Sequence, residues 1–332
     1  MPGFGVQQQG GSLQPQTLAA ISLMSSGVYP TRGNIFFVDP FVGSDSNPGT
    51  AVAPLATLAQ ALSLATAGQN DIVYLCANTN TAAQTTDYQI ATLNWNKDQV
   101  HLIGVNGSPF LGQRSRISCN SGVTSFANLF TVSANGCQIS NIEFFQGAGS
   151  TDPSAASTCV TVSGQRNHFI NCRISGIGDT KLDDAGSNSL TITGSENMFE
   201  HCYIGLDTVL RATSVTEVIL SGTPARTLFE RCHFETYTSG STFKMITVPT
   251  GADRWVILES CRIHAVQNIT SAVAPTGAIG ITTMNGAVLV NNPFLYGFAQ
   301  YTTADNAYVQ VLGINGLATG HLVGIAQGVD AA

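Results

Sequence analysis

The feature that most restricts the fold of this chain is a phrase that recurs about every 30 residues. Its anchors are cysteines or asparagines, and successive anchors are 31, 30, 30, 29 and 31 residues apart. The anchors are Asn141, Cys172, Cys202, Cys232, Cys261 and Asn292. Around each cysteine, an apolar residue stands three positions earlier and another stands two positions later. A repeat of this length indicates stacked supersecondary units, each too small to bury an apolar face alone.

A second phrase precedes each anchor. It is a run of three residues rich in Val, Ile, Leu and Thr, followed within a few positions by a glycine. The runs are 130–132, 160–162, 190–192, 218–220, 246–248 and 279–281, and the glycines are Gly136, Gly164, Gly194, Gly222, Gly251 and Gly286. Period-two alternation indicates strands, and no segment between the runs keeps a helical period. Each unit is therefore predicted as strand, tight turn, strand, small corner, strand and variable loop.

Stacking of such units pairs equivalent strands in parallel, about 4.8 Å apart. Side chains that point inward then form ladders along the stack. We predict three ladders: Cys172, Cys202, Cys232 and Cys261; Ile174, Ile204, Phe234 and Ile263; and Phe169, Phe199, Phe229 and Leu258. The polar residues before the cysteines suit an exposed corner; they are Asn171, His201, Arg231 and Ser260. The loops 175–189, 205–216, 235–243 and 265–278 should leave from one edge and form one face, which in solenoids is often the binding face.

This pattern resembles the right-handed parallel β-helix of the pectate-lyase-like superfamily, over residues 34–300. The resemblance implies an all-β solenoid of about 30 residues per coil. It implies little about activity, because this fold hosts lyases, hydrolases, viral spikes and inert structural parts.

The segment 34–76 is predicted to cap the N-terminal end of the coil. It comprises a strand at 35–38, a polar loop, a helix with Leu55, Leu58, Leu62 and Ala65 on its apolar face, and a strand at 71–76. Pro54 suits the first turn of the helix and Gly68 its end. This order resembles the opening of β-helix domains in bacteriophage tail spikes and related virion proteins, where the helix covers the open end of the coil. Such an end exposes core and unpaired strand edges.

The two ends of the chain lack the repeat. Within residues 1–33, the segment 1–16 is rich in Gly and Gln, and 17–26 shows a short helical pattern. They are either a disordered tail or an extended arm that becomes ordered against another subunit. Residues 301–332 contain two predicted strands, 308–312 and 321–325, which would cap the coil or pair with another chain.

Composition narrows the classes of function. Charged residues make up only 10% of the chain, the net charge is −7, and the three lysines form no basic stripe, so we expect no binding to nucleic acid. No apolar run approaches the ~20 residues of a membrane span. The N-terminus lacks the pattern of a signal peptide. We therefore expect synthesis in the reducing host cytoplasm, with all eight cysteines as thiols.

Two groups of residues are candidate sites. The first is the acidic loop with Asp179, Asp183 and Asp184, which is either a weak catalytic candidate or an ordinary solvated surface. The second is the column Arg173, Tyr203, His233 and Arg262, with Glu200, Glu230 and Glu259 expected to flank it. The column is either a saccharide-binding wall or a polar outer wall whose charges pair between coils.

No metal site or cofactor is predicted. Asp39, Asp45 and Asn47 fall in the polar loop before the helix, but their spacing matches no calcium-binding hand. Asx turns, in which a side chain accepts from nearby backbone N–H groups, explain them better.

These observations favour a non-enzymatic virion protein: a bacteriophage capsid decoration (cement) protein or a short spike. Such proteins commonly form trimers. The partners would be sister chains and, through residues 1–33, the major capsid protein or another virion protein. The alternative is a tail spike that binds or cleaves a bacterial surface polysaccharide; as an enzyme it would be a lyase or a glycoside hydrolase.

Overall fold

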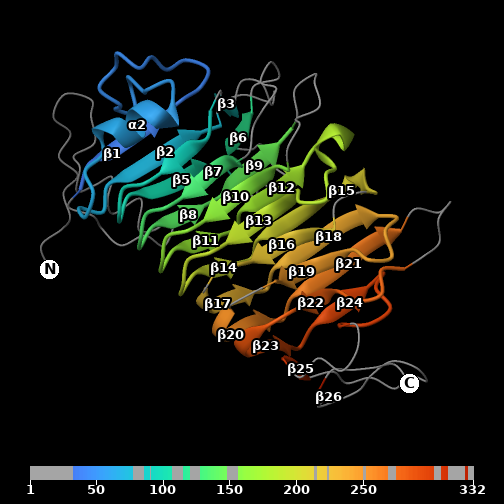
Figure 1. Ribbon diagram of the computed structural model, residues 1–332. Helices are drawn as coiled ribbons and strands as arrows, with labels where there is room; N and C mark the ends of the chain where they lie inside the picture. Colours follow the sequence, from blue (N-terminus) through green and yellow to red (C-terminus); the bar gives the residue numbers. More distant parts are fainter. Residues whose placement is uncertain are drawn as a thin grey trace, which may run out of the picture.

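The computed structural model describes residues 33–77, 86–89, 91–106, 115–119, 128–147, 156–212, 215–222, 224–249, 252–267, 274–302, 308–312 and 326–327. Over these residues the chain is the predicted all-β, right-handed parallel β-helix. Three sheets run along the stack of coils, which in Figure 1 advances from the blue end to the red end. Nearly all of the predicted arm, 1–33, and its helix at 17–26 lie outside the described residues.

The first sheet has 11 strands. They are β1 (Ile35–Val38), β2 (Ile72–Cys76), β5 (His101–Val105), β8 (Gln138–Ser140), β11 (His168–Ile170), β14 (Met198–Glu200), β17 (Ala225–Glu230), β20 (Ala252–Glu259), β23 (Met284–Asn291), β25 (Val309–Leu312) and β26 (Ala326–Gln327). All neighbours in this sheet are parallel except β25 and β26.

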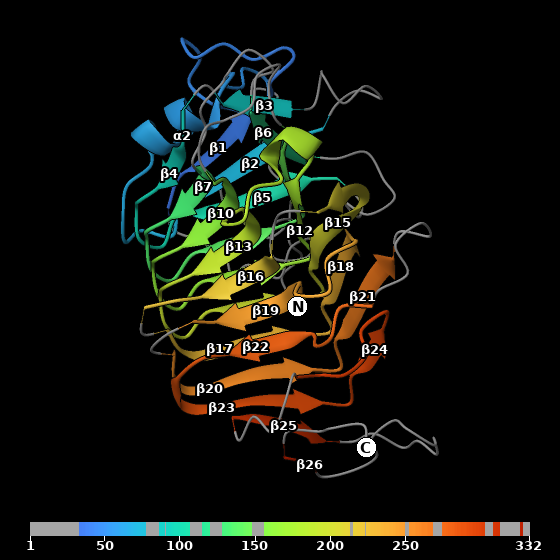
Figure 2. The same cartoon turned by 45° about the vertical axis from the view of Figure 1, so that its right-hand side comes forward.

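The second sheet has 8 strands and the third has 7. The second contains β3 (Thr86–Gln89), β6 (Ser115–Cys119), β9 (Ile142–Gln146), β12 (Arg173–Ile177), β15 (Tyr203–Arg211), β18 (His233–Thr238), β21 (Arg262–Gln267) and β24 (Phe294–Tyr296). The third contains β4 (Leu93–Trp95), β7 (Asn128–Val132), β10 (Thr158–Val162), β13 (Asn188–Ile192), β16 (Thr216–Leu220), β19 (Lys244–Val248) and β22 (Ile279–Ile281). Figure 2 shows the third sheet from the front, with the second sheet set at an angle to it.

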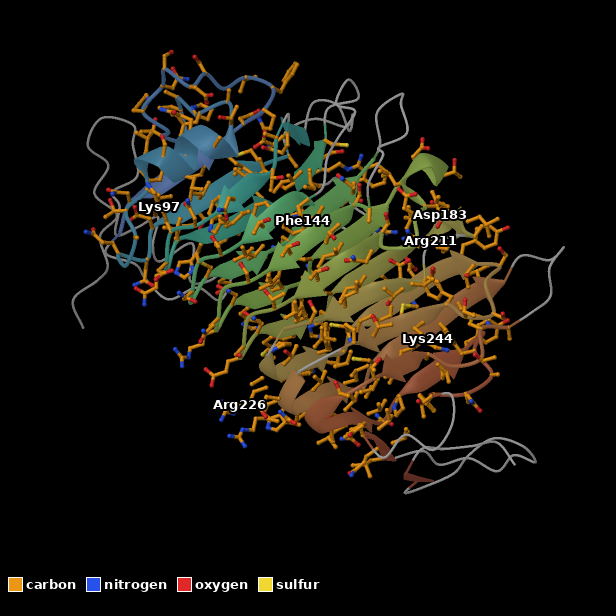
Figure 3. All side chains as sticks on the ribbon, in the orientation of Figure 1. Lys97, Phe144, Asp183, Arg211, Arg226 and Lys244 are labelled. Atoms are coloured by element: carbon orange, nitrogen blue, oxygen red, sulfur yellow. The ribbon has the colours of Figure 1, made fainter. Side chains whose placement is uncertain are left out.

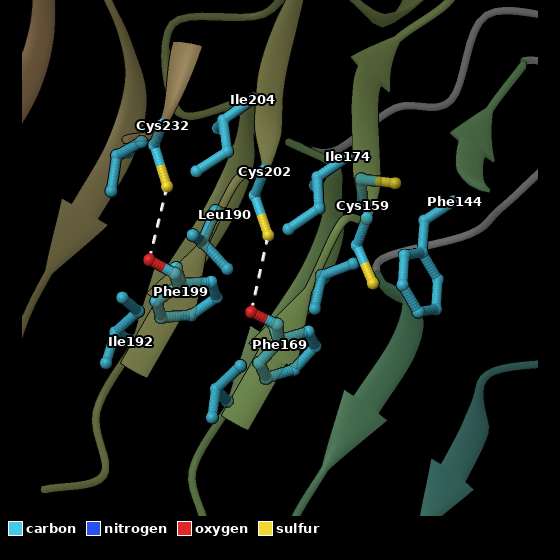
Figure 4. Close-up of a cluster of buried hydrophobic side chains, with 14 of the residues drawn as sticks. Phe144, Cys159, Phe169, Ile174, Leu190, Ile192, Phe199, Cys202, Ile204 and Cys232 are labelled. Atoms are coloured by element: carbon cyan, nitrogen blue, oxygen red, sulfur yellow. Dashed lines mark hydrogen bonds between the residues drawn. The ribbon is translucent and has the colours of Figure 1, made fainter. Parts of the chain in front are cut away.

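The predicted ladders are present in the core. Phe169, Phe199 and Phe229 stack with ring centroids 4.8 and 5.0 Å apart. In Figure 4, Cys202 Sγ donates to the carbonyl oxygen of Phe169 (3.6 Å) and Cys232 Sγ to that of Phe199 (3.3 Å). Each thiol therefore bonds to the backbone of the preceding coil, and the strand register repeats with it. The repeat length varies by no more than one residue because each side chain must fit a continuous, fully buried interior.

The predicted alignment is wrong by one residue at its two ends. Asn141 lies opposite Asn171, not Cys172, and Asn171 Nδ2 donates to Asn141 Oδ1 (2.7 Å). At the other end, Asn292 lies opposite Ser260. Both asparagines are corner residues, because an asparagine tolerates the left-handed conformation that the corner requires, whereas the inward position is apolar.

The corner between the first and second sheets consists of one left-handed residue per coil. Its φ angles lie between 47 and 57°. The corner residues are Asn141, Asn171, His201, Arg231, Ser260 and Asn292. For residues other than glycine this conformation costs roughly 1–2 kcal/mol. The cost is offset because the N–H of each corner residue donates to the next coil, as from His201 N to the carbonyl oxygen of Glu230 (3.0 Å).

The N-terminal cap is present, but its helix is shorter than predicted. Helix α2 (Leu58–Leu64) begins after Thr57, whose Oγ1 accepts from Gln60 N (3.2 Å). Pro54 precedes the helix because Leu55 is still extended, donating to the carbonyl oxygen of Phe37 beside β1 (2.9 Å). Leu58, Ala61 and Leu62 pack into the main core, and α2 lies at the blue end of the stack in Figure 1.

In the polar loop before α2, the Asx-turn interpretation is confirmed for Asp39 but is wrong for Asp45 and Asn47, whose side chains bond to residues across the loop. Asp39 Oδ1 accepts from the backbone N–H groups of Phe41 and Val42 (2.9 and 3.2 Å). Asp45 accepts from the N–H groups of Ala56 and Thr57 (both 2.9 Å) and so holds the loop against the start of the helix.

Three of the predicted loops begin as strand. β15 runs to Arg211, β18 to Thr238 and β21 to Gln267, so the second sheet extends well beyond the hydrophobic ladders. At these starts the loop prediction was wrong, because parallel pairing with the neighbouring strand holds the segments although they lack a regular apolar alternation; Thr236, for example, pairs with Ala265. The loop 178–187 carries only a short 3-10 helix, η2 (Thr180–Leu182).

At the C-terminal end, β25 extends the first sheet by parallel pairing with β23, which agrees with the strand predicted at 308–312. The strand predicted at 321–325 lies outside the described residues. The predicted limits of the β-helix, 34–300, and of the C-terminal capping segment, 301–332, stay predictions. Within the described part of the chain, no helix has the length and hydropathy needed to span a bilayer.

All eight cysteines lie within the described residues as thiols, and seven of them are buried. Burial raises the pKa of Cys137 to about 12 and that of Cys76 to about 11. We therefore expect negligible alkylation by iodoacetamide at pH 8 in the folded protein, since seven thiols are buried away from the reagent and the raised pKa of Cys76 leaves little of the nucleophilic thiolate. In denaturant, all eight should react, as counted by intact mass. Rapid labelling of Cys202 or Cys232 in the folded protein would contradict the buried ladder.

Candidate functional site

The outer face of the second sheet carries a continuous column of polar and aromatic side chains. Strand pairing places Arg173 beside Tyr203, Tyr203 beside His233, and His233 beside Arg262. Along each strand, the column residue is followed by a residue of the inward ladder that contains Ile174. The column therefore faces away from the core. The structure thus brings the four predicted residues together in one row.

The three flanking glutamates are not on this face. Glu200, Glu230 and Glu259 are in register with one another on the first sheet, on the other side of the left-handed corner. Arg231, at the corner, contacts two of them, with Nη2 at 3.1 Å from Glu200 and 2.7 Å from Glu230. The expectation that they flank the column was wrong because the corner changes the direction of the chain between adjacent residues.

A groove of about 560 Å³ runs between the corner and the column. Its volume falls within the range of about 300–1,000 Å³ that is usual for ligand sites. Its lining residues are Asn171, His201, Tyr203, Arg231, Cys232, His233, Ser260 and Arg262. The rings of Tyr203 and His233 lie 4.8 Å apart, so neighbouring coils present ring surfaces along the groove.

Nearer the N-terminal end, the same outer face holds a chain of ion pairs. Arg116 Nε lies 2.6 Å from Glu143 Oε2, and Arg173 Nη2 lies 3.1 Å from Glu235 Oε1. Glu143, Arg173 and Glu235 are each less than a tenth exposed. Gly205, at φ +100°, lies between Arg173 and Glu235, and a Cβ there would lie 1.9 Å from the backbone oxygen of Glu235. The first pair joins neighbouring coils and the second spans two coils, so charges pair between coils as the alternative of a paired outer wall supposes.

Glu235 and Asp207 are site residues that the sequence analysis missed. The pKa of Glu235 is raised to about 7, chiefly by burial; the guanidinium of Arg173 opposes this shift, and the charges of Asp207 and Glu217 add to it. Burial also lowers the pKa of His233, and the neighbouring His264 and Arg262 add to this effect. Asp207 was assigned to a loop, and only the irregular pairing of β15 with β18 brings it near Glu235. No sequence signal would have identified this pair.

The raised pKa of Glu235 predicts a pH-dependent effect of the substitution Glu235→Gln. The folded pKa, about 7, exceeds the ordinary value of 4.5, so the stability associated with the protonated acid is present below pH 4.5 and is lost as the pH rises through 7. Relative to the Gln variant, the natural protein should lose about 3 kcal/mol across this interval. Urea unfolding of both proteins from pH 4 to pH 8 measures the difference. A constant difference would contradict the burial of an ionisable group here.

The acidic loop has a structural role in part. Asp183 Oδ2 accepts from the backbone N–H of Ala212 (2.7 Å), which ties this loop to the end of β15. Figure 3 shows Asp183 close to Arg211 at this edge of the molecule. The backbone oxygens of Asp179 and Asp184 accept from Leu182 and Ser187 within the loop. Within the described residues, no group of three or more His, Cys, Asp or Glu side chains is arranged so that it could hold a metal ion, and this includes the three aspartates of the loop.

A buried ion pair lies inside the coil behind this loop. Arg211 Nη2 contacts Glu217 Oε1 at 2.7 Å, and both side chains are fully buried. Glu217 also accepts from Ser189 and Thr236. Burial raises the pKa of Glu217, while Arg211 opposes that shift. Arg211 Nε and Nη1 have no hydrogen-bond partner among the described residues.

Comparison with known proteins identifies the fold but not the family. No protein-family model matches the chain, and no curated protein matches it. Among solved structures, a rhamnogalacturonan lyase is 16% identical, with 80% of this chain and 68% of that one covered and a TM-score of 0.51. Pectin methylesterase PemA from Erwinia chrysanthemi is 14% identical, with 81% and 80% covered and a TM-score of 0.49. At this identity, what the chain shares with the lyase is the parallel β-helix fold.

Proposed function

We propose that the protein is a non-enzymatic structural part of a bacteriophage particle, of the capsid-decoration or spike type, and that it acts as a trimer. The observation that carries this proposal is the use of charged groups on the outer face: Glu143, Arg173 and Glu235 are buried in contacts that join coils. Contacts of this kind stiffen a rod. The resemblance of residues 34–76 to the opening of virion β-helices supports the same proposal.

In this proposal, residues 1–33 contact the major capsid protein or another virion protein. Quantitative mass spectrometry of purified particles tests it. Hundreds of copies per particle are expected for a decoration protein, and a few to a few tens for a spike. Deleting residues 1–16 should release the protein from the particle without unfolding it. Absence of the protein from the particles would overturn this proposal. Normal loading of the truncated chain would overturn the role of the arm.

The groove favours a second candidate function: a spike that binds a bacterial surface polysaccharide. Tyr203, His233 and Arg262 line it from successive coils, and a sugar ring can pack on an aromatic face while its hydroxyl groups bond to polar neighbours. A glycan panel assayed for binding and for new reducing ends tests this candidate. Binding without cleavage is expected. Turnover that is abolished in Asp183→Ala or Asp184→Ala would instead establish an enzyme and defeat the structural proposal.

A further inference from the structure

The outer side of the first sheet carries an apolar strip at the N-terminal end of the stack. We propose that residues 17–26 of the same chain dock on this strip and that residues 27–32 connect them to β1. The strip consists of Ile35, Phe37, Ile72, Tyr74 and Ile103. In Figure 1 the three strands that carry it, β1, β2 and β5, lie side by side at the blue end. This inference does not rest on the proposed role in a phage particle.

The strip faces away from the main core. Val73 belongs to that core, and successive residues of a strand point to opposite sides, so Ile72 and Tyr74 point outward. Ile35 stands beside Ile72, and Ile103 stands beside Tyr74. Ile72 and Ile103 form a separate cluster, with Ile35 and Tyr74 packed against it. The sheet therefore carries apolar residues on both sides here, which is typical of a sheet that is covered on both sides.

The strip is buried from its outer side. Ile72 is 0% exposed and Ile103 is 2% exposed, whereas Val105, on the same strand and the same side as Ile103, is 46% exposed. Ser140 Oγ, beside Ile103, is also buried and has no hydrogen-bond partner among the described residues. Helix α2 is not the cover, because its buried residues belong to the main core on the opposite side. The burial thus indicates a cover from outside the described part of the chain.

The cover reaches the strip from the amino ends of the strands. Ile72, the first residue of β2, is fully buried, whereas Val105, the last residue of β5, is exposed. The segments that follow β2 and β5 leave from the opposite, carboxyl ends. The chain enters β1 at the amino ends, where the fully buried Asp71 accepts from the backbone N–H of Asn34 (2.6 Å). Residues 1–32 therefore join the described structure beside the buried end of the strip.

The sequence of this segment suits the strip. Leu18, Ile21 and Met24 recur at helical spacing, and Gly27 follows as a stop. A helix over 17–26 would be about 15 Å long, which matches the width of four paired strands, about 14 Å. Residues 27–32 can span up to about 20 Å and so return the chain to β1. Residues 1–16 show no apolar period, so docking involves only the second half of the arm.

The distribution of charge supports the same place and the same occupant. Residues 1–31 contain no Lys, Arg, Asp or Glu, and the strip contains none either. Farther along the same side of the sheet stand the carboxylates of Glu200, Glu230 and Glu259. An uncharged apolar segment is stabilised by covering the strip, whereas covering the row of carboxylates would remove them from water at a cost.

Hydrogen–deuterium exchange of the full-length protein, measured by mass spectrometry, tests the docking. Backbone amides of residues 17–26 should exchange at least about tenfold more slowly than those of residues 1–16, because docking holds the helix in place. Ile103→Ser should abolish this difference, since it removes apolar surface from the strip. Val105→Ser is the matched control, because Val105 lies on the same side of the same strand but is exposed. It should change the exchange of residues 17–26 less than about twofold.

A variant in the segment itself keeps the test valid if the strip variant misfolds. Ile21→Ser should abolish the protection of residues 17–26, as Ile103→Ser does. Leu23→Ser is its matched control, because Leu23 lies off the helical stripe formed by Leu18, Ile21 and Met24. The double variant of Ile21 and Ile103 should lose no further protection, since both substitutions break the same contact.

Other results would overturn the inference. Equally fast exchange in residues 1–16 and 17–26 would mean that the segment does not dock. Protection that survives both Ile21→Ser and Ile103→Ser, in variants shown by circular dichroism to be folded, would place the segment elsewhere. Protection that disappears on about hundredfold dilution would assign the strip to the segment of a sister chain. The count of copies per particle tests the proposed function independently of these results.

Discussion

Replacing Arg211 with methionine should lower the free energy of unfolding by about 3–5 kcal/mol, because it leaves the carboxylate of Glu217 buried without its countercharge. Both side chains are fully buried, and their contact is 2.7 Å long. Unfolding in urea, followed by circular dichroism, measures the loss. A change under about 1 kcal/mol would show that the pair is far more accessible than its burial indicates.

The double substitution Arg211→Met with Glu217→Met is the matched control. Glu217 occupies the position held by Cys159 and Ser189 in the two preceding coils and by Met245 in the next, so methionine suits this row. The double variant should recover most of the lost stability, since apolar residues often replace a buried pair without cost. Two nitrogens of Arg211 have no hydrogen-bond partner within the described part of the chain, which favours that result. A double variant as unstable as the single one would contradict it.

The second large effect is expected for Phe199→Ala. The Phe199 ring is fully buried between Phe169 and Phe229, with centroid distances of 4.8 and 5.0 Å. Truncation leaves a cavity on the axis of the core, which backbone pairing on both sides prevents from collapsing. We expect a loss of about 3–5 kcal/mol in the free energy of unfolding.

Phe199→Leu is the corresponding control, because Leu258 holds the same position two coils later. It should cost less than about 1.5 kcal/mol. Thermal unfolding of the three proteins, monitored by circular dichroism, ranks them. If the alanine and leucine variants were equally stable, the stack would contribute no specific packing.

The ladders could be predicted because a fixed period determines which residues stand above one another. The corner was harder. Asn141 and Asn292 resemble the cysteines in their spacing, and only the observed φ angles assign them to the corner beside Asn171 and Ser260. Moving the alignment by one residue exchanges an inward position for a left-handed corner position. The residue type alone does not show which of these two positions an asparagine occupies.

The candidate site was predictable in part for the same reason. The column from Arg173 to Arg262 follows from the period, whereas its neighbours depend on local irregularities. Asp207 approaches Glu235 through a register shift between Leu206 and Leu210, which no repeat encodes. Asp183 proved to bond the backbone of Ala212, a contact between loops of different coils that spacing does not reveal.

The sequence by itself determined the β-helix, its period, its ladders and the reduced state of its cysteines, because stacking repeats each local choice in every coil. Only the tertiary structure decided the direction of each side chain at the corner, the length of the second-sheet strands and the burial of Arg211 with Glu217. These features depend on how adjacent coils fit against each other, where one left-handed residue or one bulge moves a side chain to another face.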